Sequence, residues 1–116
     1  HPAAYIAESA KLGTGIIAAP FAFVGARASI ADHCLLNVHS SVGHEAVLGA
    51  YCVLSPYADI NGGGLIEDSV FMGAHACIMP RLKVGRQSKI ASGAVAYNDI
   101  PSQTTALGNP AACRSK

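Results

Sequence analysis

The chain has 116 residues, of which 51% are hydrophobic and 13% charged, and its formal net charge is +1. This length and composition predict a single domain with a buried core and exclude a disordered segment. Because Trp is absent, aromatic residues are few and no basic cluster occurs, the sequence also argues against a nucleic-acid partner.

The sequence gives no sign of membrane insertion or disulfide bonding. An apolar run at residues 15–26 is twelve residues long, shorter than a bilayer span, and it contains Gly and Pro. It lacks the basic flank that a signal peptide requires. The four cysteines form no C-x-x-C pair, and three of them lie among apolar residues. We therefore expect a reduced, cytoplasmic protein without a membrane span.

A six-residue period runs through residues 6–101. Every sixth residue from Ile6 is apolar, the residue four places later is small or aliphatic, and Gly follows the apolar position six times. Neither the period of a strand nor that of a helix produces this pattern. The sixteen apolar positions, here called anchors, are Ile6, Leu12, Ala18, Val24, Ile30, Leu36, Val42, Leu48, Leu54, Ile60, Ile66, Met72, Ile78, Val84, Ile90 and Ala96.

A hexad with two inward positions describes a short strand followed by a tight turn. Three hexads close one triangular coil of 18 residues, and successive coils stack at the strand spacing of roughly 4.8 Å. The sequence therefore predicts an all-β parallel β-helix, in which residues 18 apart are neighbours. We expect one domain over residues 1–116, with a junction at 1–5, coils over 6–101 and a C-terminal cap over 102–116.

His44 takes the third position of its hexad, which points outward at a corner. Its neighbours one coil before and after, Ala26 and Gly62, are small, so the imidazole stands in a groove that the Gly62 N–H can also reach. A base beside such a donor suits acyl transfer, because the base removes the proton of an amine or hydroxyl and the N–H stabilises the oxyanion. Glu45 is placed to orient the imidazole, and Arg27, one coil earlier, to keep Glu45 ionised.

Over essentially the whole chain, the hexads resemble the left-handed parallel β-helix of the hexapeptide-repeat acyltransferases, which are usually trimers. ALGNPAA at residues 106–112 is similar to the turn that ends the helix in that family. The string N-x-x-S-x-V-G-H-E at residues 37–45 resembles the sugar-acetylating branch, which includes the bacillosamine-pathway acetyltransferase and the sialic acid O-acetyltransferases. The roles of general base, supporting acid and substrate-holding amide in that branch fall on His44, Glu45 and Asn37.

The resemblance also implies acetyl-CoA as co-substrate, bound in a groove between two subunits of a homotrimer, and no metal. Gly62, one coil after the base, corresponds to the Gly whose N–H binds the acetyl carbonyl. Ala74 and Ser92, which are 18 residues apart, are the further positions expected to contact the cofactor. The leading hypothesis is therefore acetyl transfer to the amino group of a nucleotide-linked 4-amino sugar.

Two features depart from the branch. Val53 stands where its members often have a second His, nine residues after the base. The opening HPAAYIAESAKLG is similar to the junction that follows a small α/β domain in relatives, where that domain binds the nucleotide sugar. We therefore expect this chain to lack the nucleotide-sugar-binding domain.

Three alternatives remain open. O-acetylation of sialic acid or a surface polysaccharide would use the same base, and a structural or binding β-helix trimer would need no catalysis. A hexapeptide-type carbonic anhydrase would need three metal-ligating histidines. The candidates His39 and His75 share a column with Tyr57 between them, which places them two coils, roughly 10 Å, apart and too far to share a metal.

Overall fold

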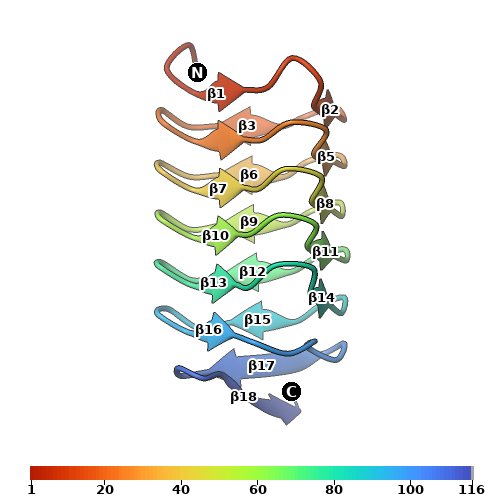
Figure 1. The fold of residues 1–116 in the computed structure, drawn as a ribbon, viewed down its shortest axis with the longest axis vertical. Helices are drawn as coiled ribbons and strands as arrows, with labels where there is room; N and C mark the ends of the chain where they lie inside the picture. The colour runs from red at the N-terminus through yellow and green to blue at the C-terminus, as the bar shows by residue number, and fades with distance from the viewer. Residues whose placement is uncertain (116) are drawn as a thin grey trace.

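The computed structural model describes residues 1–115 as a stack of about six triangular coils (Figure 1). Each hexad contributes a two-residue strand that ends at an anchor, and parallel pairing joins residues 18 apart through β16, as in Val24↔Val42↔Ile60. In the last coil the separation falls to 16, as in Ile90↔Ala106. The predicted all-β parallel β-helix is confirmed. None of the described residues forms a helix, so no helical segment within them could cross a membrane.

Three sheets form the faces of the triangle, and the strands of each lie one above another (Figure 1). The first sheet contains β1 (Tyr5–Ile6), β4 (Phe23–Val24), β7 (Ser41–Val42), β10 (Asp59–Ile60), β13 (Cys77–Ile78) and β16 (Val95–Ala96). The second contains β2 (Lys11–Leu12), β5 (Ser29–Ile30), β8 (Val47–Leu48), β11 (Leu65–Ile66) and β14 (Lys83–Val84). The third contains β3 (Ile17–Ala18), β6 (Leu35–Leu36), β9 (Val53–Leu54), β12 (Phe71–Met72), β15 (Lys89–Ile90), β17 (Thr104–Leu107) and β18 (Ala112–Ser115).

The turns between sheets stack into three corners. We call the turns between the first and second sheets the histidine corner (residues 7–10, 25–28, 43–46, 61–64 and 79–82). Those between the second and third sheets form the carboxylate corner (13–16, 31–34, 49–52, 67–70 and 85–88). Those between the third and first sheets form the ladder corner (19–22, 37–40, 55–58, 73–76 and 91–94).

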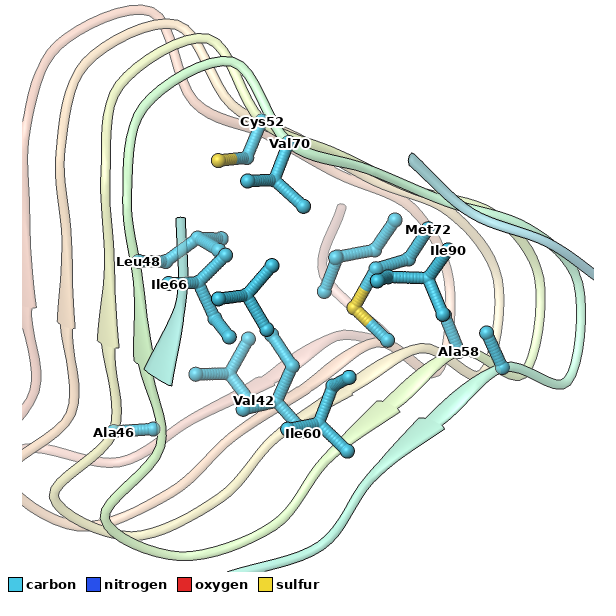
Figure 2. Packing of buried hydrophobic residues seen from close by; sticks show 14 of the residues in the cluster. Val42, Ala46, Leu48, Cys52, Ala58, Ile60, Ile66, Val70, Met72 and Ile90 are labelled. Carbon is cyan, nitrogen blue, oxygen red and sulfur yellow. The ribbon is translucent and has the colours of Figure 1, made fainter. Parts of the chain in front are cut away.

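The core fills the inside of the triangle with anchor side chains (Figure 2). From Val24 onward every anchor is buried, and small buried residues such as Ala46 and Ala58 fill the corners. Close packing of this kind leaves the outward strand position and the turn as the places where chemistry can vary. The first coil differs from the sequence expectation, since the Leu12 anchor is 43% exposed. No coil covers it on the N-terminal side within residues 1–115.

The last described residues cover the C-terminal end of the stack. β17 pairs in parallel with β15, and β18 folds back antiparallel on β17. The turn between them also reaches the first sheet, because the Val95 N–H donates to the Gly108 carbonyl at 3.0 Å and the Ala111 N–H donates to the Val95 carbonyl at 2.8 Å. The segment thus occupies strand edges that would otherwise stay open.

Candidate active site

An open cleft of about 430 Å³ lies where the first sheet meets the histidine corner. The sheet contributes outward side chains from β4, β7 and β10, and the corner contributes turns from four successive coils. Because the outward side chains and the turns stack in columns, residues far apart in the sequence meet here. Those that matter below are Phe23, Ser41, His44, Asp59, Gly62 and Arg81.

His44 and Glu45 form a hydrogen-bonded pair at this cleft. The His44 Nδ1 and Glu45 Oε1 atoms are 3.3 Å apart, and the two side chains are 65% and 55% exposed. A carboxylate acceptor at Nδ1 favours the tautomer that carries its proton there, which leaves Nε2 as the proton acceptor. The sequence expectation that Glu45 orients the imidazole thus has the matching geometry.

Glu45 is held in its ionised form by two neighbours. The hydrogen bond from His44 and, next, the positive charge of Arg27 hold the pKa of the Glu45 carboxyl below its usual value. The Arg27 Nε lies 3.5 Å from Glu45 Oε2, which confirms the predicted pair between adjacent coils. The carboxylate therefore remains available to stabilise an imidazolium at neutral pH.

Gly62 lies directly beneath the imidazole of His44. A Cβ atom built on Gly62 would collide with His44 Nε2 and would lie 2.6 Å from its Cε1. Gly43 is restricted in the same way, because a Cβ there would lie 2.7 Å from the Gly62 nitrogen. His44 Nε2 and the Gly62 backbone can adjoin only because glycine occupies both positions.

The third-position amides of the histidine corner have no hydrogen-bond acceptor. Within residues 1–115, the N–H groups of Ala26, His44 and Gly62 donate to no protein oxygen. An amide without a protein partner is satisfied by water or by a bound molecule. The Gly62 amide is therefore free to donate to a ligand oxygen near Nε2.

The predicted Asn37 site does not lie at this cleft. Asn37 is half-buried in the ladder corner, and its Nδ2 donates to the Leu54 carbonyl of the next coil at 2.9 Å. Asn61, at the equivalent hexad position, does line the cleft and makes the same bond, to the Ile78 carbonyl at 2.8 Å. Both side chains thus join adjacent coils, and the single chain does not bring Asn37 to His44.

Ala74 and Ser92 also lie at the ladder corner, on adjacent coils. The Gly93 N–H donates to the Ala74 carbonyl at 2.9 Å, and a Cβ on Gly73 would lie 2.6 Å from the Ser92 nitrogen. Within the described residues the N–H groups of Ala74 and Ser92 have no acceptor. As expected, Ala74 and Ser92 lie one above the other on adjacent coils, but within one chain they belong to a different corner from His44.

Asp59 is a candidate that the sequence analysis missed. It is half-buried on β10 and lines the cleft, and burial raises the pKa of its carboxyl group, with the Ser41 hydroxyl offsetting part of the effect. A signal was present in the sequence, because Asp59 is the sole acid among the sixteen residues that precede the anchors. Arg81, which the sequence analysis does not consider, also lines the cleft.

The histidines proposed as metal ligands in the carbonic anhydrase alternative are stacked on an aromatic ring. His39 and Tyr57 have ring centroids 4.8 Å apart, and Tyr57 and His75 4.9 Å apart, with nearly parallel planes. Within residues 1–115 no three His, Cys, Asp or Glu side chains are grouped closely enough to hold a metal ion.

The chain matches no family model but is similar to several sugar acetyltransferases. It is 32% identical to the GDP-perosamine N-acetyltransferase of Escherichia coli O157:H7, covering 96% of this chain and 52% of that protein. The crystal structure of PerB from Caulobacter crescentus, in complex with CoA and GDP-perosamine, superposes with a TM-score of 0.96 at 29% identity, covering 99% of this chain and 56% of that one.

A third relative is the acetyltransferase domain of PglB from Neisseria gonorrhoeae FA1090, whose structure was solved in complex with acetyl coenzyme A. It superposes with a TM-score of 0.93 at 31% identity, covering 97% of this chain and 55% of that one. The chain thus spans about half the length of these relatives. Its coils correspond to a shared solenoid domain.

Proposed function

The chain belongs to the hexapeptide-repeat β-solenoid acetyltransferases, and from that premise we propose that it transfers the acetyl group of acetyl-CoA to the amino group of a nucleotide-linked 4-amino sugar. The observation that carries this proposal is the position of His44 Nε2 directly above Gly62, beside an amide that has no protein acceptor. The relatives named for GDP-perosamine support the class of acceptor.

In the proposed mechanism His44 is the general base. Its Nε2 takes a proton from the neutral acceptor amine as the amine nitrogen attacks the thioester carbonyl carbon. The carbonyl oxygen becomes an oxyanion, which accepts a hydrogen bond from the Gly62 N–H. When the C–S bond breaks, the imidazolium gives that proton to the sulfur of CoA, and the amide is released.

Glu45 supports this cycle through its bond to Nδ1. The carboxylate stabilises the imidazolium that forms during attack, as the acid does in a catalytic triad. Its pKa is held low by His44 and Arg27, so it stays charged throughout the neutral range. Asn37 remains a proposed substrate-holding residue, and because its Nδ2 is bonded to the Leu54 carbonyl, its Oδ1 is the atom left for an acceptor hydroxyl.

We propose that acetyl-CoA lies along the ladder corner and contacts Ala74 and Ser92. Their free N–H groups, one coil apart, suit the successive carbonyl oxygens of a pantetheine arm. Since they lie at a different corner from His44, a homotrimer in which the ladder corner of one chain faces the cleft of another would complete the site. Exposed apolar side chains on the outside of the third sheet, such as Ile17 and Phe71, support such an interface.

The domain plan proposed for residues 1–116 is one left-handed β-helix with a junction at 1–5, coils over 6–101 and a cap over 102–116, of which Lys116 lies outside the described residues. The left hand is supported by Figure 1, where the first-sheet strands run to the right on the near side and the third-sheet strands run to the left on the far side as the chain descends. The reduced cytoplasmic location also remains a prediction, supported by four cysteines that are free thiols in the structure.

The test is acetyl-CoA turnover, read as released thiol, with GDP-, UDP- and dTDP-linked 4-amino sugars as acceptors. His44→Ala is expected to lower kcat by about 10²–10⁴-fold. His33→Ala is the matched control, because His33 is an exposed histidine of the carboxylate corner that stacks on Tyr51. Equal activity of the His44 and His33 variants would contradict the assignment of the base, and absence of turnover with every acceptor would contradict the proposed activity.

A further inference from the structure

Asp59 is the sole acidic residue among those that line the cleft. It stands on β10, three residues before Gly62, and its outward side chain shares the first sheet with Ser41 of β7 on the preceding coil. It therefore occupies the sheet side of the cleft while His44 occupies the corner side. A molecule in this cleft would meet the base and the carboxylate together.

Asp59 has no cationic partner within residues 1–115. The ion pairs of the described chain use Glu45 and Glu67. Asp32 and Asp68 accept hydrogen bonds from backbone amides. Asp59, by contrast, is half-buried beside a neutral hydroxyl and near the Cys77 thiol. A half-buried carboxylate without a cation is disfavoured in its charged form, so the position suits a positively charged ligand group.

We propose that Asp59 binds the acceptor amino group in its ammonium form and thereby selects amine acceptors over hydroxyl acceptors. This inference rests on the proposed acetyltransferase function and assigns a residue to its choice of acceptor. A hydroxyl group carries no charge to compensate the half-buried carboxylate, whereas an ammonium makes a charge-assisted hydrogen bond with it. The cleft thus distinguishes N-acetylation from O-acetylation.

The proton balance of the reaction fits this role. A bound ammonium must lose one proton before its nitrogen can attack, and that proton passes to the Asp59 carboxylate and from there to water at the open cleft. The neutral amine then attacks, and its second proton passes to His44 and on to the sulfur of CoA. The sum is ammonium plus thioester giving amide, thiol and one proton in solution.

The experiment compares two sugars that differ in one group. Methyl 4-amino-4,6-dideoxy-α-D-mannoside and methyl α-D-rhamnoside, which carries a hydroxyl at the same carbon, are titrated by NMR into CoA-saturated protein at pH 7. We expect wild type to bind the amino sugar about tenfold more tightly, the difference that one charge-assisted hydrogen bond provides. Asp59→Asn should abolish this preference and leave the affinity of the hydroxy sugar unchanged, while Asp59→Glu should restore part of it.

Glu8→Gln is the matched control, since Glu8 is an exposed carboxylate of the histidine corner outside the cleft lining. It should leave the preference intact. An undiminished preference in Asp59→Asn, or wild type that binds both sugars equally or neither, would overturn the proposal. Because binding is measured without turnover, failure here is distinct from failure of the proposed function, which would appear as absent acetyl transfer by a protein that still prefers the amino sugar.

Discussion

The carboxylate corner and the histidine corner share one backbone turn but treat its third amide differently. In three turns of the carboxylate corner an acidic side chain of an adjacent coil accepts that N–H, whereas in the histidine corner no side chain within residues 1–115 accepts it and the N–H stays free. We call an amide capped when a side-chain carboxylate accepts its N–H. The capped amides are those of Thr14, bonded to Asp32 Oδ1 at 2.8 Å, Ala50, bonded to Asp68 Oδ1 at 2.9 Å, and Arg86, bonded to Glu67 Oε1 at 3.0 Å.

This difference separates a corner that stabilises the fold from one that can bind a ligand. A capped amide has a protein partner and contributes to stability, while an uncapped one depends on water or on a ligand. The ladder corner is mixed, because Pro20 and Pro56 lack the N–H at this position whereas Val38, Ala74 and Ser92 leave it free. Within residues 1–115 the third amides of Asp32 and Asp68 are also free, so a free amide permits a turn to bind a ligand but does not by itself identify a functional turn.

The largest expected effect on the histidine corner is the loss of activity when Gly62 gains a side chain. In Gly62→Ala the new Cβ would collide with the His44 ring, so the imidazole must turn away from the oxyanion position. We expect kcat to fall by about 10²–10³-fold, since the base and the N–H donor are both displaced. The melting temperature should change little, because the ring is exposed and can move into solvent. Unchanged turnover would show that Gly62 does not adjoin the reacting atoms.

Glu45→Gln tests the support of the base at the same corner. The glutamine keeps a hydrogen-bond acceptor for Nδ1 but removes the charge. We expect activity to fall about tenfold, because a charge-assisted hydrogen bond is replaced by a neutral one. Because His44 and Arg27 hold the Glu45 pKa below its usual value, its support is lost only as pH falls through that depressed pKa. A rate profile between pH 6 and 8 should therefore show no step from Glu45, and such a step that vanishes in Glu45→Gln would contradict this reading.

Asp68→Ala should affect stability and leave activity unchanged. It leaves the Ala50 N–H uncapped, and we expect the free energy of unfolding in urea to fall by about 1 kcal/mol. Asp68→Asn keeps an acceptor oxygen and should retain most of that stability. A loss of acetyl transfer in Asp68→Ala, with the fold intact, would remove the proposed division between the two corners.

The smallest expected effect is a stability gain in Asp59→Asn. Burial raises the pKa of Asp59 above its unfolded value, so the ionised form weakens the fold above the folded pKa, and the penalty disappears as pH falls below the unfolded value. The variant should therefore melt about 1–3 °C higher than wild type at pH 7 and at the same temperature near pH 3. A lower melting temperature at pH 7 would indicate that Asp59 stabilises the fold.

The period of the sequence was sufficient to predict the coils and the meeting of His44 with Gly62. Anchors are buried because both neighbouring coils cover them, so hexad position alone determines their environment. Adding 18 to a residue number then gives its neighbour on the next coil through β16, as for Arg27 and Glu45. It fails in the last coil, where paired residues are 16 apart and no hexad signal marks the change. The anchors of the first coil, Ile6, Leu12 and Ala18, are the exceptions, since burial also requires a coil on each side.

Other parts of the site depend on how deeply a side chain is buried and on where it points, and the period of the sequence specifies neither. Asp59 occupies an outward strand position that the hexad pattern treats as solvent-facing, and the cleft becomes visible only when β7, β10 and the corner are packed together. Asn37 matches a motif, yet its Nδ2 bonds along the stack to Leu54. A linear pattern cannot distinguish a side chain that joins coils from one that faces a substrate.

The repeated pairing of residues 18 apart, which holds from β1 to β16, gives the molecule a modular length. Each coil contacts only the coils next to it, so stability accumulates coil by coil and contacts never grow more distant in sequence as the stack lengthens. Removing or duplicating a whole coil away from β4, β7, β10 and the turn that holds Arg81 would preserve every column within the cleft. A deletion of one residue between His44 and Gly62 would instead shift the two out of line. The number of coils and the chemistry of the site can therefore be altered separately, provided that changes come in whole turns.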